Sequence, residues 1–248
     1  MDTQNLKVSV FSHRRSGTHL TIDSLINNFK PYGDFISIDS STKYQLDKRD
    51  IESDSVIFKS HSEQNLDDFF EDQYLTKLVR STNIIYVYRD GRDVMASLYD
   101  YKKSYDKNTK GKSFATFIRE KNDYYCSNDY SDLSRVEYWC RHVSGWLNKQ
   151  DILFIKYTDW LNDYIATIEK IEDYLGIKSL DETKDVRVQG RLKGLLKKYF
   201  GKNKISSVHV NKGKTGRYVN YFDENDLRYY EKIFSKNFKH QLLNLKDL

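Results

Sequence analysis

The stretch from Ser12 to Thr18, Ser-His-Arg-Arg-Ser-Gly-Thr, brings two arginines, three hydroxyl side chains and a glycine together within seven residues. An apolar run at 8–11 precedes it, and a helical pattern beginning at Leu20 follows it. A tight turn between a strand and a helix directs several backbone N–H groups at one point, beside the positive end of the helix dipole. These residues predict a binding site for a phosphate or sulfate group. The same turn is also compatible with an ordinary connection that carries solvated arginines.

The loop lacks the residues with which a Walker A loop holds a nucleotide and magnesium. Aligned with that motif, GxxxxGK[ST], Thr18 takes the place of the lysine and His19 that of the hydroxyl residue that binds Mg²⁺. The basic residue, Arg15, instead precedes the glycine. The pattern therefore predicts an anion held by N–H groups and an arginine, and it predicts no metal site.

Four segments resemble the motifs of sulfotransferases that use 3′-phosphoadenosine 5′-phosphosulfate (PAPS). Residues 15–18, Arg-Ser-Gly-Thr, resemble that family's 5′-phosphosulfate loop, and residues 59–61, Lys-Ser-His, resemble its Lys-Thr-His segment. Residues 86–97, from Tyr-Val-Tyr-Arg to Ala-Ser, are similar to its 3′-phosphate motif, and 213–216, Gly-Lys-Thr-Gly, to its C-terminal loop. The motifs stand in the family order and span most of the chain. The resemblance implies transfer of a sulfuryl group from PAPS, leaving 3′-phosphoadenosine 5′-phosphate (PAP) as product.

The resemblance implies three catalytic residues, His61, Arg15 and Lys59. An imidazole titrates near neutral pH, so His61 is the candidate base that takes the proton of the attacking acceptor. Arg15 stands where many members have lysine, and its planar guanidinium suits two oxygens of the leaving phosphate. Lys59 is expected to contact the transferring sulfonate. The competing interpretation is a polar loop histidine without a role for His61, and a surface cation for Arg15 or Lys59.

The implied site for PAPS draws on several separate segments. Its expected residues are Arg14, Arg15, Ser16, Gly17, Thr18, His19, Arg89, Ser97, Tyr157, Lys212 and Gly213. Arg89 and Ser97 are assigned to the 3′-phosphate, and Tyr157 resembles a tyrosine that contacts adenine. Asn211 stands where an arginine is common, which leaves open whether Lys214 or Arg217 replaces that arginine.

The segment 187–217 contains ten lysines or arginines and no acidic residue, whereas the rest of the chain is net acidic. Within it, apolar residues recur at helical spacing over 188–200. A basic amphipathic helix can lie on an anionic membrane or cover a binding site. Because this segment precedes the 3′-phosphate loop, we expect 188–217 to form a lid and that loop, with core packing as the alternative.

Short apolar runs alternate with helical patterns along the chain. The pattern predicts strands at 8–11, 35–38, 55–59, 83–88 and 151–156, and helices from Leu20, at 66–78, after 90, at 113–149, 160–175 and 223–238. This alternation predicts an α/β fold, a three-layer P-loop-like arrangement with a mostly parallel sheet and helices on both faces. Ligands bind at the carboxyl ends of the strands in such sheets. Arg15, His61, Arg89 and Tyr157 all follow predicted strands, so they are expected at one edge.

Length and composition indicate one domain over 1–248, with a single proline and no repeat. The N-terminal residues lack an apolar signal region and no run is long enough for a membrane span, so a cytoplasmic location is expected. Cys126 and Cys140 are in no metal-binding spacing. The sequence leaves the oligomeric state open.

A PAPS-dependent sulfotransferase is the favoured function, with a small-molecule or carbohydrate acceptor and no nucleic-acid partner. A P-loop nucleotide kinase is one alternative, which the missing lysine after Gly17 weakens. A non-catalytic binder of nucleic acid, membrane or another anion, acting through 187–217, is the other.

Overall fold

The computed structural model describes residues 6–39, 55–69, 73–124, 126–187 and 214–238. In this part of the chain five strands form one sheet in the order β2-β3-β1-β4-β5, and each neighbouring pair is parallel. The strands are β1 Val8–Ser12, β2 Phe35–Ser37, β3 Ile57–Ser60, β4 Asn83–Tyr88 and β5 Ile152–Lys156. Since each lies within one residue or two of its expected range, the predicted parallel sheet is confirmed.

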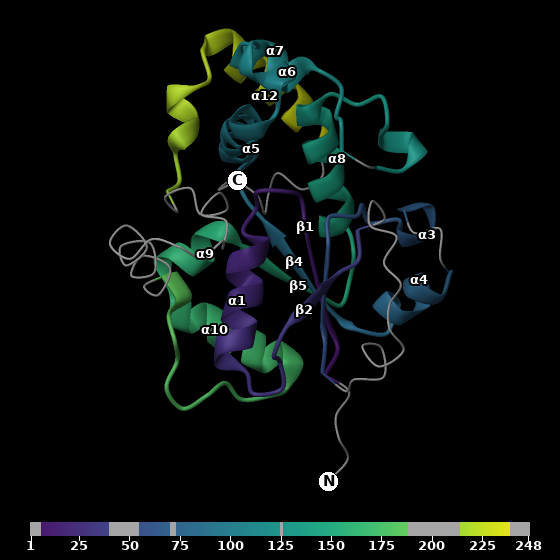
Figure 1. The fold of residues 1–248 in the computed structure, drawn as a ribbon, viewed down its shortest axis with the longest axis vertical. Helices are drawn as coiled ribbons and strands as arrows, with labels where there is room; N and C mark the ends of the chain where they lie inside the picture. The colour runs from purple at the N-terminus through teal and green to yellow at the C-terminus, as the bar shows by residue number, and fades with distance from the viewer. Residues whose placement is uncertain (1–5, 40–54, 70–72, 125, 188–213, 239–248) are drawn as a thin grey trace.

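Helices cover both faces of this sheet (Figure 1). On one face lie α1 Thr18–Asn28, α9 Tyr157–Asn162 and α10 Tyr164–Leu175. Their apolar side chains pack on strand residues such as Val10 and Ile85, which are fully buried. On the other face α3 Leu66–Phe69 and α4 Gln73–Arg80 pack on Phe11 and Tyr86, together with Trp146. The expected three layers are therefore present.

A second group of helices lies beyond the carboxyl ends of the strands, at the top of Figure 1. It consists of α5 Gly91–Tyr105, α6 Lys107–Lys110, α7 Phe114–Arg119, α8 Arg135–Leu147 and α12 Glu224–Asn237, with a short 3₁₀ turn η2 at Arg217–Asn220. Of these, α5, α7, α8 and α12 share a core around Trp139, which is fully buried. The carboxyl ends of the strands are thus covered by this second group of helices.

Two of the predicted helices were wrong in their extent. The helix expected over 113–149 is interrupted, because α7 ends at Arg119 and α8 begins only after Ser134. The Ser134 side chain accepts the N–H of Glu137, whose carboxylate accepts the N–H of Ser134, so this capping box starts a new helix. The helix expected over 160–175 begins already at Tyr157 and is broken where Asp163 caps α10.

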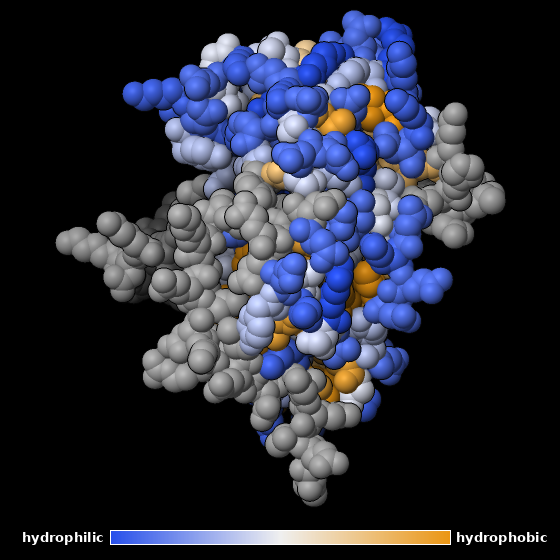
Figure 2. Space-filling view, turned by 90° about the vertical axis from the view of Figure 1, so that its right-hand side faces the viewer, coloured by the Kyte–Doolittle hydropathy of each residue, from blue (hydrophilic) through white to orange (hydrophobic). Residues whose placement is uncertain are grey.

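Other predicted boundaries agree with the structure. Gly176 ends α10 with a φ of 66°, a left-handed conformation that glycine adopts without strain. Asp90 caps α5 by accepting the N–H of Arg92. None of the helices in the described ranges combines the length and the apolarity that crossing a bilayer requires. Figure 2 shows a face on which the described surface is mostly hydrophilic.

Candidate active site

The loop between β1 and α1 is shaped by Gly17, the N-cap of α1. Gly17 has a φ of 109°, which side-chain-bearing residues rarely adopt. A Cβ atom at this position would stand 2.7 Å from Cδ2 of Tyr157, the first residue of α9. The backbone of the loop therefore lies directly against Tyr157, and only glycine allows that approach. Arg15 also has a positive φ, 68°.

Several features of this loop fit a bound anion. The first N–H groups of a helix have no partner within the helix, and Gly17 provides no side-chain cap for α1. The first turn of α1 contains no acidic residue that would repel an anion. The Ser16 hydroxyl is buried without a hydrogen-bond partner, while Thr18 and Ser12 bond to each other, with Oγ1 and Oγ 2.5 Å apart. A phosphate or sulfonate oxygen would satisfy the Ser16 hydroxyl.

Arg15, Arg89 and Ser97 converge beside this loop although they come from different segments. The Arg15 Nε–H donates to the Ser97 hydroxyl at 3.1 Å, and the Arg89 Nη1 group donates to the Arg15 carbonyl at 3.4 Å. The Arg89 guanidinium stacks over the Tyr157 ring, 4.5 Å from its centroid, and its Nε atom is buried without a hydrogen-bond partner. Two cations and a hydroxyl thus surround one region, which suits a second anionic group.

His61 follows β3, and its imidazole is fixed against the end of β1. The ring Nδ1 lies 2.8 Å from the Ser12 carbonyl oxygen. A carbonyl oxygen can only accept, so Nδ1 carries the proton and the Nε2 lone pair is available to a substrate. Burial lowers the pKa of His61 below its usual value, and the Lys59 and Arg14 cations act in the same direction against Asp39. His61 is therefore neutral near pH 7, the form that a base requires.

Lys59 does not extend into this region as an isolated cation. Its ammonium group lies 3.3 Å from Asp39 Oδ2 and 3.3 Å from the Ser37 hydroxyl. Asp39 also accepts the main-chain N–H of His61 at 2.7 Å and the hydroxyl of Ser60 at 3.1 Å. Burial acts to raise the pKa of Asp39, but the Lys59 cation and the main-chain N–H of His61 outweigh it and hold that pKa below its usual value. Lys59 thus supports Asp39, whereas its expected contact with a sulfonate stays a prediction.

Asp39 directly follows the strand predicted at 35–38, and no motif in the sequence marked it, so sequence reasoning missed it. Asp93 is similar: its carboxylate accepts the N–H groups of Gly216 at 2.8 Å and Tyr218 at 3.1 Å. It thereby fastens the segment after 213 to the start of α5, where Arg89 donates to the Lys214 carbonyl at 2.9 Å. The charge of Asp39 and Asp93 and their positions in the sequence do not indicate hydrogen bonds to residues so far along the chain.

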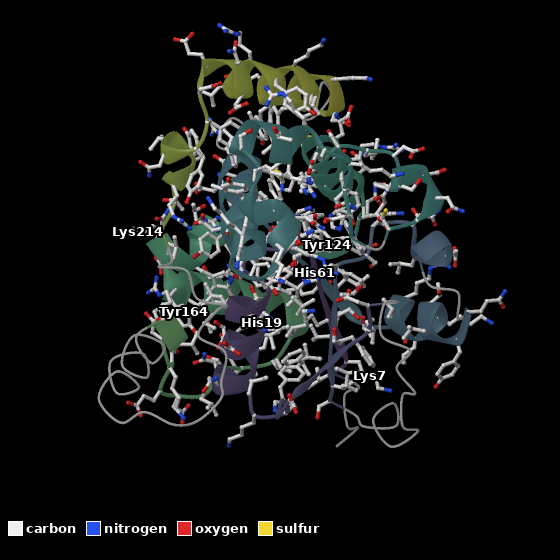
Figure 3. The ribbon with its side chains drawn as sticks, turned by 45° about the horizontal axis from the view of Figure 1, so that its top comes forward. Lys7, His19, His61, Tyr124, Tyr164 and Lys214 are labelled. Atoms are coloured by element: carbon white, nitrogen blue, oxygen red, sulfur yellow. The ribbon has the colours of Figure 1, made fainter. Side chains whose placement is uncertain are left out.

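The remaining predicted residues have varied positions. The half-buried Arg14 guanidinium lies 4.4 Å from the centre of the Tyr124 ring, and exposed His19 lies near Phe35. Figure 3 shows His61 and Tyr124 between the strands and the helices above them. Arg217 donates to Asp100 at 2.5 Å. Lys212 and Gly213, with the expected lid at 188–200, lie outside the described residues.

A family model for the sulfotransferase domain matches residues 7–241. The chain is 26% identical over 194 residues to flavonol 3-sulfotransferase of Flaveria bidentis, covering 67% of this chain and 59% of that protein. It is 23% identical over 172 residues to amine sulfotransferase of Oryctolagus cuniculus, covering 63% and 54%. The matches therefore span little more than half the length of these relatives.

Solved structures with the same fold cover nearly the whole chain. A mouse sulfotransferase complexed with PAP superposes with a TM-score of 0.67 and 18% identity, covering 96% of this chain and 87% of that one. Retinol dehydratase in complex with androsterone and PAP superposes with a TM-score of 0.64 and 21% identity, covering 99% and 84%. At this identity the likeness concerns the fold, and it confirms the P-loop-like architecture.

Proposed function

This chain belongs to the sulfotransferase domain family, and on that premise we propose that it transfers a sulfuryl group from PAPS to an acceptor. The observation that carries the proposal is the convergence of Arg15, Arg89 and Ser97 at the same edge of the sheet as His61, where β1, β3 and β4 end. Two anion sites next to an imidazole whose Nε2 is available match the needs of this reaction.

The chain offers a partner for each anionic part of PAPS. The N–H groups after Arg15 and the hydroxyls of Ser16 and Thr18 would hold the 5′-phosphosulfate, because Ser16 lacks an internal partner. Arg89 and Ser97 would hold the 3′-phosphate, and the Arg89 Nε atom likewise lacks a partner. Tyr157 would contact the adenosine. When bound, PAPS supplies the sulfuryl group, and PAP remains.

His61 acts as the base in this proposal. Its Nε2 takes the proton of the acceptor hydroxyl or amine as the acceptor atom attacks. The Nδ1–H bond to the Ser12 carbonyl keeps Nε2 unprotonated and aimed away from β1. The Arg15 guanidinium offsets the negative charge that grows on the leaving phosphate oxygen, and it does so without donating a proton.

We assign the acceptor to small molecules or carbohydrates. The relatives named for an amine and a flavonol act on small molecules, which supports this assignment. The Arg14 cation acts on the imidazole of His61 and lies over the Tyr124 ring, and Tyr138 packs against His13. Aromatic rings with one cation suit an acceptor that carries a ring or an anionic group.

Radiolabelled PAPS and a panel of phenols, steroids, amines and sugars test the proposal. We expect label transfer to at least one class, and micromolar binding of PAP in calorimetry that EDTA does not change. ATP with Mg²⁺ is the comparison ligand for a nucleotide kinase. Binding of ATP with Mg²⁺ but not of PAP would overturn the proposal.

A further inference from the structure

His142 is fully buried in the middle of α8, and its ring contacts the main chain of His61. Its Nε2 atom is 3.2 Å from the main-chain oxygen of His61. Its other ring nitrogen, Nδ1, is 2.8 Å from the hydroxyl of Tyr86, a fully buried residue of β4. A chain of two hydrogen bonds therefore joins the central sheet to the main chain of the candidate base.

The protons in this chain can be assigned from donor and acceptor chemistry. The His61 carbonyl oxygen can only accept, so His142 Nε2 carries a proton. Burial lowers the pKa of His142 to about 4, so its ring is neutral at pH 7 and Nδ1 is unprotonated. The Tyr86 hydroxyl consequently donates to Nδ1. Tyr86 thus selects the tautomer of His142 that bonds to His61.

The main chain of His61 is held on its other side as well. Asp39 accepts the His61 N–H at 2.7 Å, and Trp146, one turn after His142 on α8, donates to the Ser62 carbonyl at 3.0 Å. The position of the imidazole depends on its main chain, because the ring has only two side-chain torsions. Displacing a catalytic group by about 1 Å can cost about 100-fold in rate.

We infer that His142 and Tyr86 are positioning residues for His61. They contact neither substrate nor the transferring group; they hold the His61 carbonyl so that Nε2 points at the acceptor. This inference rests on the proposed function, because His61 matters as a base only if the chain transfers sulfuryl groups. His142 lies outside the motifs that resemble the family, and Tyr86 is the first residue of the segment 86–97, in which only Arg89 and Ser97 were given a role.

Three variants test the inference through turnover. His142→Leu removes the bond to His61, and we expect kcat to fall by about tenfold or more while PAP affinity stays within about threefold. His142→Gln keeps an N–H donor at similar reach and should recover most of that loss. Tyr86→Phe leaves His142 free to change tautomer, so a smaller loss of kcat is expected. Tyr164→Phe is the matched control, since it removes a buried tyrosine hydroxyl on the opposite face of the sheet.

The melting temperature of each variant separates this role from a purely structural one. A lower melting temperature with unchanged kcat at a permissive temperature would overturn the inference, as would equal losses in the glutamine and leucine variants. If His142→Leu does not fold, the comparison of Tyr86→Phe with Tyr164→Phe decides the question.

Nitrogen-detected NMR of the histidine rings gives a readout without turnover. The wild-type protein should show the Nδ1–H form of His61 and the Nε2–H form of His142. We expect Tyr86→Phe to mix the His142 tautomers and to shift the His61 ring signals, and Tyr164→Phe to leave both unchanged. Absence of label transfer by the wild type would refute the proposed function alone. Unchanged His61 signals in Tyr86→Phe would overturn the positioning role.

Discussion

The imidazole of His61 has its protonation state set by its surroundings before any acceptor arrives. The Ser12 carbonyl oxygen accepts the hydrogen bond from Nδ1–H, and burial together with nearby cations lowers the pKa of the ring. Because its pKa is lowered, the imidazole stays neutral and able to accept a proton over a wider pH range. The lowered pKa also makes it a weaker base in sulfuryl transfer, and the fixed orientation of Nε2 offsets that loss.

We predict that His61→Ala lowers kcat by about 100-fold or more and leaves PAP affinity within about threefold, since the base acts on the acceptor.

In the wild-type protein kcat/KM should stay level as pH falls through 6.5. A base works when neutral, and a lowered pKa moves its protonation to more acid pH. Rates between pH 5 and 8 check this. An acid limb centred at 6.5 would contradict the lowered pKa, and near-normal turnover of the variant would exclude His61 as base.

Arg89 differs from its neighbour Arg92 in what it can bind. Arg89 is buried beside Arg15 and Tyr157, with Asp93 Oδ2 at 3.5 Å from its Nη2 and its Nε without a partner. Arg92 pairs with Asp90 at 2.6 Å, outside the converging cluster. We predict that Arg89→Ala weakens PAP binding by about 2–3 kcal/mol, because a phosphate loses a charge-assisted partner. Arg92→Ala is the matched control and should change the affinity for PAP little. Calorimetry with PAP and with adenosine 5′-phosphosulfate, which lacks the 3′-phosphate, separates the roles. Equal losses for both ligands would make Arg89 structural.

At the scale of elements, the close packing of α1 and α9 shapes the anion loop. The N-terminus of α1 approaches Tyr157 through Gly17, and the fully buried Trp160 donates to the Thr21 hydroxyl at 2.9 Å. The two helices follow β1 and β5, which β4 separates in the sheet, and both pack on the same face. The loop therefore depends on α9, although α9 lies about 140 residues later in the chain.

We predict that Gly17→Ala destabilises the protein by about 1–3 kcal/mol and weakens PAP binding, because the new Cβ atom meets the Tyr157 ring at a positive φ. Gly33→Ala is the matched control, since a Cβ atom there has no neighbour within 4 Å. Urea unfolding and calorimetry of both variants give the comparison. Similar behaviour of the two variants would show that the loop tolerates a side chain.

At the scale of the whole molecule, the protein buries several histidines and one carboxyl group, and their titrations have opposite effects on the stability of the fold as pH changes. Burial lowers the pKa of His13 and His142, which are almost fully buried. Burial also raises the pKa of Glu63 to about 7. The stabilising contribution of the histidines is present above their unfolded pKa of about 6.5 and is lost as pH falls, whereas Glu63 destabilises the fold as pH rises toward 7.

We predict that the free energy of unfolding falls as pH drops from 6.5 to 5, because three histidines with lowered pKa values, His13, His61 and His142, outweigh one carboxyl group. Each fully buried group contributes up to about 1.4 kcal/mol per pH unit. Glu63→Gln removes the opposing contribution, so this variant should lose stability more steeply over the same range. Urea unfolding at several pH values measures both slopes. A wild-type stability that rises on acidification would contradict the prediction.

The sequence by itself determined the succession of strands and helices along the chain. It also determined that Arg15, His61, Arg89 and Tyr157 lie at one edge of the sheet. Strand and helix periods are local patterns, and parallel strands place the residues that follow them at one edge. The helix start predicted after 90 and the helix end predicted at 175 were also correct, and Asp90 and Gly176 are the caps there. The capping box at Ser134 is a local signal too, but the longer apolar pattern masked it.

Only the tertiary structure decided which side chains hold His61 and Arg89 in place. Asp39 bonds to a residue 22 positions later, His142 to one 81 positions earlier, and Asp93 to one 123 positions later. Each bond needs two elements brought together by packing and two side chains in compatible rotamers. Neither condition leaves a periodic trace along the chain, because a hydrogen bond depends on distance and direction in space.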